Sequence, residues 1–305
     1  MRILLTGADG QLGRAIARQA DGRGIVILPQ TRRQLDITDH SRFDAAVGVL
    51  LPDMVINAAA YTSVDPAETH PDEAHAVNAA APGYMAETCA RHQIPMIHIS
   101  TDFVFDGTLR RPYRENDPLR PLNVYGRTKA EGESAIRERL DSHLIVRTSW
   151  LYDARGANFV TTILNLARER EVLRVVADQQ GSPTSATDLA RALLGMARQV
   201  CSGKPAWGTY HFCNRGITTW HGFAETIIAL ARKSMALKVR QIDAIPTSEY
   251  PTPAERPGFS ALDCTRIQTV FGILPPPWEE SLKAVLEEFL PGNDSFQPLD
   301  ESHGT

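Results

Sequence analysis

Tyr125 and Lys129 are the residues whose types and spacing most directly suggest catalysis. They are four residues apart in the segment Tyr-Gly-Arg-Thr-Lys, which places both on one face of a predicted helix. A tyrosine with an ordinary pKa of about 10 exchanges protons poorly at neutral pH. A neighbouring ammonium favours the phenolate and lowers that pKa, so the pair could deliver a proton to a carbonyl being reduced. A surface helix with one aromatic and one cationic residue is the alternative.

Thr101 and Asp102 follow the apolar run Met96–Ser100, a predicted strand. Open α/β sheets bind their ligands at the carboxyl ends of the strands, so these side chains are expected beside the substrate. Thr101 could hydrogen-bond the substrate carbonyl or the tyrosine oxygen, and Asp102 could accept a hydrogen bond from a substrate hydroxyl. The same residues could instead cap the end of the strand.

A glycine-rich loop lies between the predicted strand Arg2–Thr6 and the predicted helix Leu12–Gln19. This is the context that a dinucleotide-binding fingerprint requires, because glycines let the backbone approach a pyrophosphate that lies at the helix N-terminus. An ordinary turn between a strand and a helix is the alternative. The cofactor-binding residues predicted here are Gly7, Gly10, Gln11, Leu12 and Gly13.

The segment after the second predicted strand bears on which nicotinamide cofactor is used. It reads Pro-Gln-Thr-Arg-Arg over residues 29–33, and Arg32 could pair with the 2′-phosphate of NADPH. A solvated basic turn is equally compatible with these residues. Asp36 and Ile37 could flank the adenine, so NADH use stays open.

The remaining elements predict how these groups are positioned. Short apolar runs alternate with helical patterns in at least five βα repeats, which indicates an α/β fold with a Rossmann-type, doubly wound parallel sheet. Less regular elements and proline-rich loops follow Trp150 and indicate a smaller, discontinuous C-terminal substrate lobe. The predicted strands are Arg2–Thr6, Ile25–Leu28, Met54–Ala58, Met96–Ser100, His143–Thr148, Leu173–Val176 and Thr209–Cys213; the predicted helices are Leu12–Gln19, Pro71–Arg91, Tyr125–Arg139, Asn158–Arg170, Ala186–Val200, Trp220–Lys233 and Trp278–Phe289.

We expect residues 1–152 and 186–214 to form the dinucleotide-binding domain, and residues 153–185 and 215–293 to form the substrate lobe. Residues 294–305 are polar and aperiodic, which predicts a disordered tail.

Composition excludes several other classes of protein. The net charge is −4 with a pI near 6.1, so neither a nucleic-acid partner nor an anionic membrane surface is expected. The four cysteines are widely spaced and form no structural-zinc pattern. No signal peptide and no apolar stretch of about 18 residues are evident, which predicts a cytoplasmic location.

Together these segments resemble the dTDP-4-dehydrorhamnose reductase branch of the extended short-chain dehydrogenase/reductase family. The resemblance runs from residue 1 to about residue 290. The matching segments are the Gly-x-x-Gly-x-x-Gly loop, Leu35–Thr38, Asn57–Thr62, Val64-Asp65, Ser100–Gly107, Pro121–Gly126, Arg147–Trp150, Asp178–Thr184 and Arg256-Pro257.

The resemblance implies reduction of the C4 keto group of dTDP-4-dehydro-6-deoxy-L-mannose to dTDP-L-rhamnose, with Tyr125 as proton donor and NADPH or NADH as cofactor. It places the remaining predicted site residues as follows: Ala60, Tyr61 and Thr62 near the nicotinamide, Lys129 on its ribose, Asp102 and Trp150 on the sugar nucleotide, and Arg256 on the diphosphate. From the residues alone, Trp150 could equally be a core residue and Arg256 a surface arginine. A homodimer is left open.

Related activities differ at positions that this sequence can test. A sugar-nucleotide 4,6-dehydratase needs an Asp-Glu pair after the threonine, but Phe103 occupies the glutamate position. Epimerases usually have Ser-Ser where this chain has Ser100-Thr101. Some family members bind a metal through an acidic residue after the glycine loop, but Arg14 and Ala15 follow here, so no metal is predicted. Reduction of another nucleotide-linked 4-keto-deoxysugar remains an alternative, as does a noncatalytic NADP-binding regulatory protein.

Overall fold

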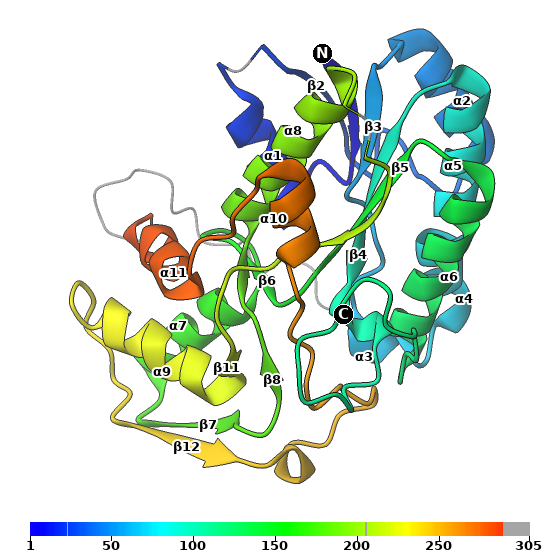
Figure 1. Cartoon of the computed structure of the whole chain (residues 1–305). Coiled ribbons are helices and arrows are strands. Elements are labelled where there is room, and N and C mark those ends of the chain that lie inside the picture. Colours follow the sequence, from blue (N-terminus) through cyan, green and yellow to red (C-terminus); the bar gives the residue numbers. More distant parts are fainter. Residues whose placement is uncertain (23, 205, 289–305) are drawn as a thin grey trace.

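The computed structural model describes residues 1–22, 24–204 and 206–288, and its centre is a six-stranded parallel sheet (Figure 1). The strand order is β10-β5-β4-β3-β1-β2, with neighbouring strands parallel throughout. This is the doubly wound α/β fold that the sequence predicts. The strands are β1 (Arg2–Thr6), β2 (Val26–Gln30), β3 (Met54–Asn57), β4 (Met96–Thr101), β5 (His143–Thr148) and β10 (Gly208–His211).

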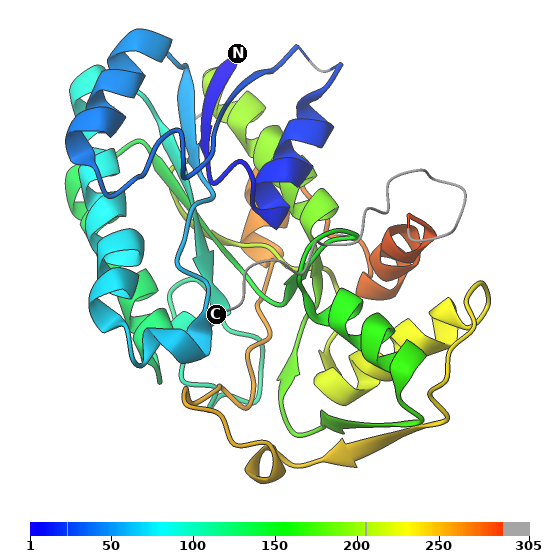
Figure 2. The ribbon, with the colours of Figure 1, turned by 180° about the vertical axis from the view of Figure 1, so that it is seen from behind.

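Helices cover both faces of this sheet, as the two opposite views show (Figures 1 and 2). Successive side chains of β1 point to opposite faces, so Leu4 packs in one hydrophobic cluster while Ile3 and Leu5 pack in another. Burial on both faces explains why the strands are continuous apolar runs. One face carries α2 (His40–Leu50), α5 (Ala81–His92) and α6 (Val124–Arg139); the other carries α1 (Gln11–Ala20), α8 (Ala186–Cys201) and α10 (Thr265–Phe271).

A third large hydrophobic cluster lies in the lower part of the molecule in Figure 1. It joins Val160, Phe223, Leu282 and the strand pair β7 (Val172–Val176) and β12 (Gln241–Ile245), which are parallel to each other. The domain boundaries proposed from the sequence stay a prediction. The helices of this cluster are α7 (Phe159–Glu169), α9 (Trp220–Ala231) and α11 (Trp278–Glu287). Short elements elsewhere in the chain are α3 (Val64–Ala67), η2 (Asp102–Val104), β6 (Leu151–Tyr152), β8 (Gln180–Gly181), β9 (Thr184–Ser185), β11 (Thr218–Thr219) and η3 (Thr247–Glu249).

The predicted elements match the observed ones within two residues at most ends; the main differences are one divided helix and three elements, α2, α10 and β12, that the sequence analysis missed. The single helix predicted over Pro71–Arg91 is α4 (Pro71–His75), a π-helical segment η1 (Ala76–Ala80) and α5 in succession. Helix α2, which the sequence analysis missed, buries only Phe43 and Val47, too sparse an apolar stripe to stand out. Strand β12 was also missed. The predicted tail, residues 294–305, and the last residue of the helix predicted over Trp278–Phe289 lie outside the described residues.

The described residues form no helix long and apolar enough to span a membrane.

A buried ion pair joins α6 to the sheet. Arg147 of β5 donates from Nε and Nη2 to the two carboxylate oxygens of Glu133, at 2.8 and 2.6 Å, and Ser100 of β4 donates to the same carboxylate at 2.6 Å. Burial alone would raise the pKa of Glu133, but the hydrogen bonds and charge of Arg147 outweigh it and hold that pKa below its ordinary value. Helix α6, which carries Tyr125 and Lys129, is thereby fixed over the ends of β4 and β5.

Replacing Arg147 by methionine should lower the free energy of unfolding by about 3–5 kcal/mol, because the buried carboxylate of Glu133 loses its main partner. Urea denaturation followed by circular dichroism measures this loss. Arg137 also reaches Glu133, at 3.1 Å, but its side chain is 35% exposed. The matched variant Arg137→Met should therefore cost no more than about 1 kcal/mol. Equal losses in the two variants would contradict the assigned role of the buried pair.

Candidate active site

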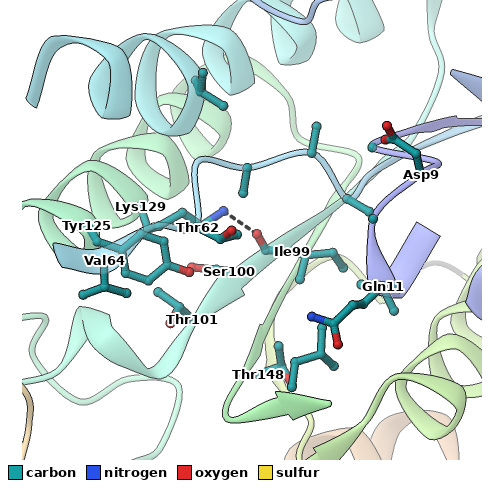
Figure 3. A pocket seen from close by; sticks show the side chains of 18 of the residues that line it. Asp9, Gln11, Thr62, Val64, Ile99, Ser100, Thr101, Tyr125, Lys129 and Thr148 are labelled. Carbon is teal, nitrogen blue, oxygen red and sulfur yellow. Dashed lines mark hydrogen bonds between the residues drawn. The ribbon is translucent and has the colours of Figure 1, made fainter. Parts of the chain in front are cut away.

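A cavity of about 660 Å³ opens where the carboxyl ends of β1, β3, β4 and β5 meet. Figure 3 shows the side chains that enter it from the glycine loop, from the end of β4 and from α6. Most of the predicted site residues line this cavity. They are Gly7, Gly10, Gln11, Leu12, Arg32, Asp36, Ile37, Ala60, Thr62, Thr101, Asp102, Tyr125, Lys129 and Trp150.

The glycine loop fits a pyrophosphate because its glycines leave no room for side chains. Gly7 has a φ of +66°, and a methyl group on it would lie 2.7 Å from the backbone of Ala58. A methyl group on Gly13 would lie 2.2 Å from the Gly7 carbonyl oxygen, so Gly13 packs the helix against the loop and does not line the cavity. Gly10 precedes α1 without a side-chain cap, which leaves backbone N–H groups of the first turn for an anionic ligand.

Arg32 and Asp36 reach the cavity from the loop after β2, the strand at one edge of the sheet. The Arg32 side chain is 83% exposed, and its Nε lies 3.8 Å from an Asp36 carboxylate oxygen. Asp36 accepts hydrogen bonds from the backbone and hydroxyl of Thr38, and the backbone bond is the main reason that its pKa is lowered. Among the described residues, the exposed guanidinium of Arg32 thus has a single long ion pair, which suits a phosphate group of a ligand.

Helix α6 begins at the cavity because its first turn is capped from two sides. The Asn123 side chain accepts the Gly126 N–H at 2.8 Å, and the Val124 N–H donates to Glu68 at 2.8 Å. The Tyr125 ring meets Phe103 edge-on, with ring centres 5.6 Å apart. Its hydroxyl points toward Ser100 and Thr101 at the end of β4 (Figure 3).

The ionisation of Tyr125 and Lys129 differs from the sequence expectation. Desolvation raises the pKa of Tyr125 to about 12, the charge of Asp102 acts in the same direction, and the interaction with Thr101 opposes it. Lys129 does not lower this pKa as expected, because its ammonium is directed elsewhere, to the Ile99 carbonyl oxygen at 2.6 Å (Figure 3). Burial lowers the pKa of Lys129 to about 8, against the effect of Glu133.

Asp102 lies in the cavity wall and has an unsatisfied buried acceptor. It is 2% exposed, one carboxylate oxygen accepts from Thr101 at 3.1 Å, and the other has no hydrogen-bond partner among the described residues. Burial raises its pKa to about 6. The Thr148 hydroxyl, also in the cavity wall, likewise lacks a partner within the described chain. Buried polar atoms of this kind are expected to meet a ligand or water.

A second cavity, of about 550 Å³, shares Phe103 and Trp150 with the first. Trp150 has a φ of +45° and stacks on Trp220 with ring centres 3.5 Å apart. A methyl group on Gly181 would lie 2.6 Å from the Trp150 ring, so only glycine allows this placement. The Trp150 indole therefore forms part of the wall of both cavities.

Arg256 lines the second cavity and not the first, and its guanidinium is already paired. It donates to both carboxylate oxygens of Asp65, at 2.9 and 2.8 Å, and to the Ala254 carbonyl oxygen at 2.7 Å. Arg170 lines the same cavity and, among the residues that the structure describes, has no side-chain partner.

Some placements differ from the predicted set. Tyr61 does not line the first cavity; its backbone is held by the Asn78 side chain, which accepts from its N–H at 2.9 Å and donates to its carbonyl at 3.0 Å. Sequence reasoning missed several lining residues because no local motif marks them: Asp9, Arg14, Ser100, Thr148, Gly156 and Ala157. Gly156 and Ala157 come from the chain after β6, and Gln11 donates to the Ala157 carbonyl at 3.2 Å.

Within residues 1–22, 24–204 and 206–288, no three histidine, cysteine, aspartate or glutamate side chains gather to hold a metal ion.

Comparison with known proteins gives a consistent family. The family described as RmlD substrate binding domain matches residues 1–290. The dTDP-4-dehydrorhamnose reductase of Aggregatibacter actinomycetemcomitans is 42% identical over 290 residues, covering 93% of this chain and 98% of that protein. The Salmonella typhimurium dTDP-4-dehydrorhamnose reductase is 39% identical over 292 residues, covering 94% of this chain and 98% of the relative.

Solved structures agree with the sequence comparisons. A dTDP-4-dehydrorhamnose reductase from Clostridium acetobutylicum superposes with a TM-score of 0.89 at 37% identity, covering 95% of this chain and 99% of that one. The Bacillus anthracis enzyme, solved in complex with NADP, has a TM-score of 0.87 at 36% identity, with 94% and 99% covered. On these full-length matches, the chain belongs to the dTDP-4-dehydrorhamnose reductase family.

Proposed function

We propose that this protein reduces the C4 keto group of dTDP-4-dehydro-6-deoxy-L-mannose to dTDP-L-rhamnose, with NADPH as the preferred cofactor. Family membership supports the reaction. The observation that carries the proposal is the meeting, in one cavity, of the glycine loop with Tyr125, Thr101 and the unpartnered oxygen of Asp102. A product assay with this sugar nucleotide and each cofactor tests the proposal. A reductase that is specific for another 4-keto sugar would leave this substrate unchanged.

The residues present fit a nicotinamide dinucleotide. Gly7, Gly10 and Leu12 would hold the pyrophosphate, Arg32 the 2′-phosphate, and Asp36 with Ile37 the adenosine. Ala60 and Thr62 would line the nicotinamide end, with Tyr61 behind them and Lys129 on the ribose. The bound cofactor supplies a hydride to the carbonyl carbon.

Tyr125 would provide the proton that the carbonyl oxygen needs as it becomes an alkoxide. Its raised pKa, about 12, keeps the phenol protonated at neutral pH, so it is a donor throughout the physiological range. Thr101 would orient the phenol and the carbonyl oxygen. Lys129 lies one helical turn from Tyr125 and would be the source of a proton for the phenolate left after proton transfer.

The sugar nucleotide would extend from the first cavity into the second. Asp102 would accept from a sugar hydroxyl through its unpartnered oxygen, and Trp150 would cover an apolar edge of the sugar where the cavities join. Arg256 could reach the diphosphate only by exchanging one of its present partners, whereas the unpaired Arg170 needs no such exchange. A homodimer and a cytoplasmic location remain predictions.

Replacing Tyr125 by phenylalanine should lower turnover about 10²–10⁴-fold, because the hydroxyl that protonates the alkoxide is lost. NADPH binding, measured by fluorescence titration, should be unchanged. Tyr84 is 43% exposed on α5 and stacks on His40, so Tyr84→Phe is the matched control and should retain full turnover. Near-normal turnover in Tyr125→Phe would show that another group is the acid.

Replacing Arg32 by alanine should weaken NADPH binding about tenfold, the change expected from losing one charge-assisted hydrogen bond. NADH binding should change little, because NADH lacks the 2′-phosphate. Arg33 is exposed and does not line the cavity, so Arg33→Ala serves as the control. Equal weakening of both cofactors by Arg32→Ala would remove the role assigned to this residue.

Replacing Arg170 by alanine should weaken dTDP binding about tenfold, measured by isothermal titration calorimetry with the nucleotide alone. Arg168, in the last turn of α7 just before Arg170, is exposed and does not line the second cavity, so Arg168→Ala should bind dTDP normally. Unaltered affinity in Arg170→Ala would place the diphosphate elsewhere.

A further inference from the structure

His98 lies behind the active site, buried between Asn57 and Lys129. It is 1% exposed on the central strand β4. Its Nδ1 is 3.1 Å from the Asn57 amide nitrogen, and its Nε2 is 3.2 Å from Lys129 Nζ. No step of the proposed reaction uses this histidine, yet its ring contacts the lysine beside Tyr125.

The orientation of the Asn57 amide is fixed by its other neighbours. The Asn57 side-chain oxygen accepts from the Ala59 backbone N–H at 3.1 Å and from the Thr6 hydroxyl at 2.8 Å. A backbone N–H can only donate, so the atom facing it must be the oxygen and not the NH₂ group. The NH₂ group of Asn57 therefore faces His98 and donates to its Nδ1.

This contact determines where the imidazole carries its hydrogen. An Nδ1 that accepts a hydrogen bond has no hydrogen of its own, so the neutral ring must be protonated on Nε2. The cationic ring is disfavoured, because burial and the charge of Lys129 hold the pKa of His98 well below its ordinary value. The Nε2–H of His98 therefore points at the amino group of Lys129.

An N–H group facing an ammonium is an unfavourable contact, whereas a neutral amine can accept that hydrogen with its lone pair. The neutral amine of Lys129 can also donate one hydrogen to the Ile99 carbonyl oxygen, 2.6 Å away, and keeps a second hydrogen for a ligand. We propose that His98, held as the Nε2–H tautomer by Asn57, is a positioning residue that favours the neutral form of Lys129.

The other charged groups around α6 either favour the ammonium form of Lys129 or act on other residues. Glu133, one turn further along the helix, favours the ammonium, but Arg147 of β5 neutralises most of its charge. Asp102 at the end of β4 acts on Tyr125, and Glu68 accepts from the start of α6. Burial, opposed by Glu133, sets the pKa of Lys129 at about 8, and the donor on His98 acts in the same direction as burial.

This inference rests on the proposed function and deepens it, because the proposed reaction makes Lys129 the partner of Tyr125. When Tyr125 gives its proton to the alkoxide, a phenolate remains and must be reprotonated. A lysine that releases its proton near neutral pH can return one to the phenolate and then recover one from water. An ordinary lysine, with a pKa of about 10.4, would release that proton less readily.

The test follows the protonation of Lys129 directly, in the free protein. The sequence has five lysines, so a chain labelled with [ε-¹³C]lysine gives few signals, and Lys129→Met assigns one of them. The other four, Lys204, Lys233, Lys238 and Lys283, are exposed and serve as internal references, whereas Lys129 should titrate near its pKa of about 8.

His98→Gln replaces the Nε2–H donor with an amide that can turn its oxygen to the ammonium. The Lys129 midpoint should rise by about one pH unit, a tenfold change in its acid constant, while the four exposed lysines stay unchanged. His143→Gln removes another buried histidine, from β5, that contacts the Leu140 carbonyl and not Lys129; it should leave all five midpoints in place. An unmoved Lys129 midpoint in folded His98→Gln overturns the proposal.

A second measurement needs no variant at all. ¹⁵N-histidine spectra of the unaltered chain distinguish the two neutral tautomers, and His98 should be protonated on Nε2 across the neutral range. A proton on Nδ1 would overturn the inference, whether or not His98→Gln folds. Both measurements are independent of the sugar nucleotide, so a chain that shows these titrations but reduces no dTDP-sugar would refute only the proposed function.

Discussion

The site depends above all on the direct backbone contact between α6 and the segments beside it. A methyl group on Gly126 would lie 2.1 Å from the Phe103 carbonyl oxygen, and one on Gly132 would lie 2.1 Å from the Asn78 carbonyl oxygen. No larger residue at either position allows the helix to approach so closely. This approach brings Tyr125 to the end of β4 and places Lys129 within reach of the Ile99 carbonyl. The arrangement of the proposed catalytic groups therefore follows from helix packing.

Close packing also buries charges, and the structure compensates each of them differently. Glu133 keeps its charge because Arg147 and Ser100 meet both carboxylate oxygens. Lys129 has no carboxylate partner at hydrogen-bond distance in the described part of the chain, and burial lowers its pKa toward neutrality. The stable ion pair holds the helix in place, and the less compensated lysine next to it is left free to exchange a proton. Stability and reactivity are thus separated by one helical turn.

The sequence predicts the parts of this arrangement that have local signatures. Five strands of the main sheet are continuous apolar runs, the glycine loop has a fixed spacing, and a four-residue interval puts Tyr125 and Lys129 on one face of a helix. The direction of Lys129 has no such signature, because it depends on His98 and Ile99, thirty residues away on β4. Tyr61 and Arg256 belong to matching motifs, but tertiary contacts with Asn78 and Asp65 hold them outside the first cavity.

The environments of Tyr125 and Asp102 separate their roles at neutral pH. Both side chains are desolvated in the same cavity wall, and this raises both pKa values. The ordinary pKa of a carboxyl group is far lower than that of a phenol, so the two raised values remain far apart. With a pKa of about 6, Asp102 is mostly ionised at pH 7 and accepts hydrogen bonds; with a pKa of about 12, Tyr125 stays protonated and donates. Phe103, beside them, can do neither. Tyr125 and Asp102 thus form a pair of one proton donor and one acceptor, which suits the proposed carbonyl reduction, and Phe103 supplies no acid for the elimination of water.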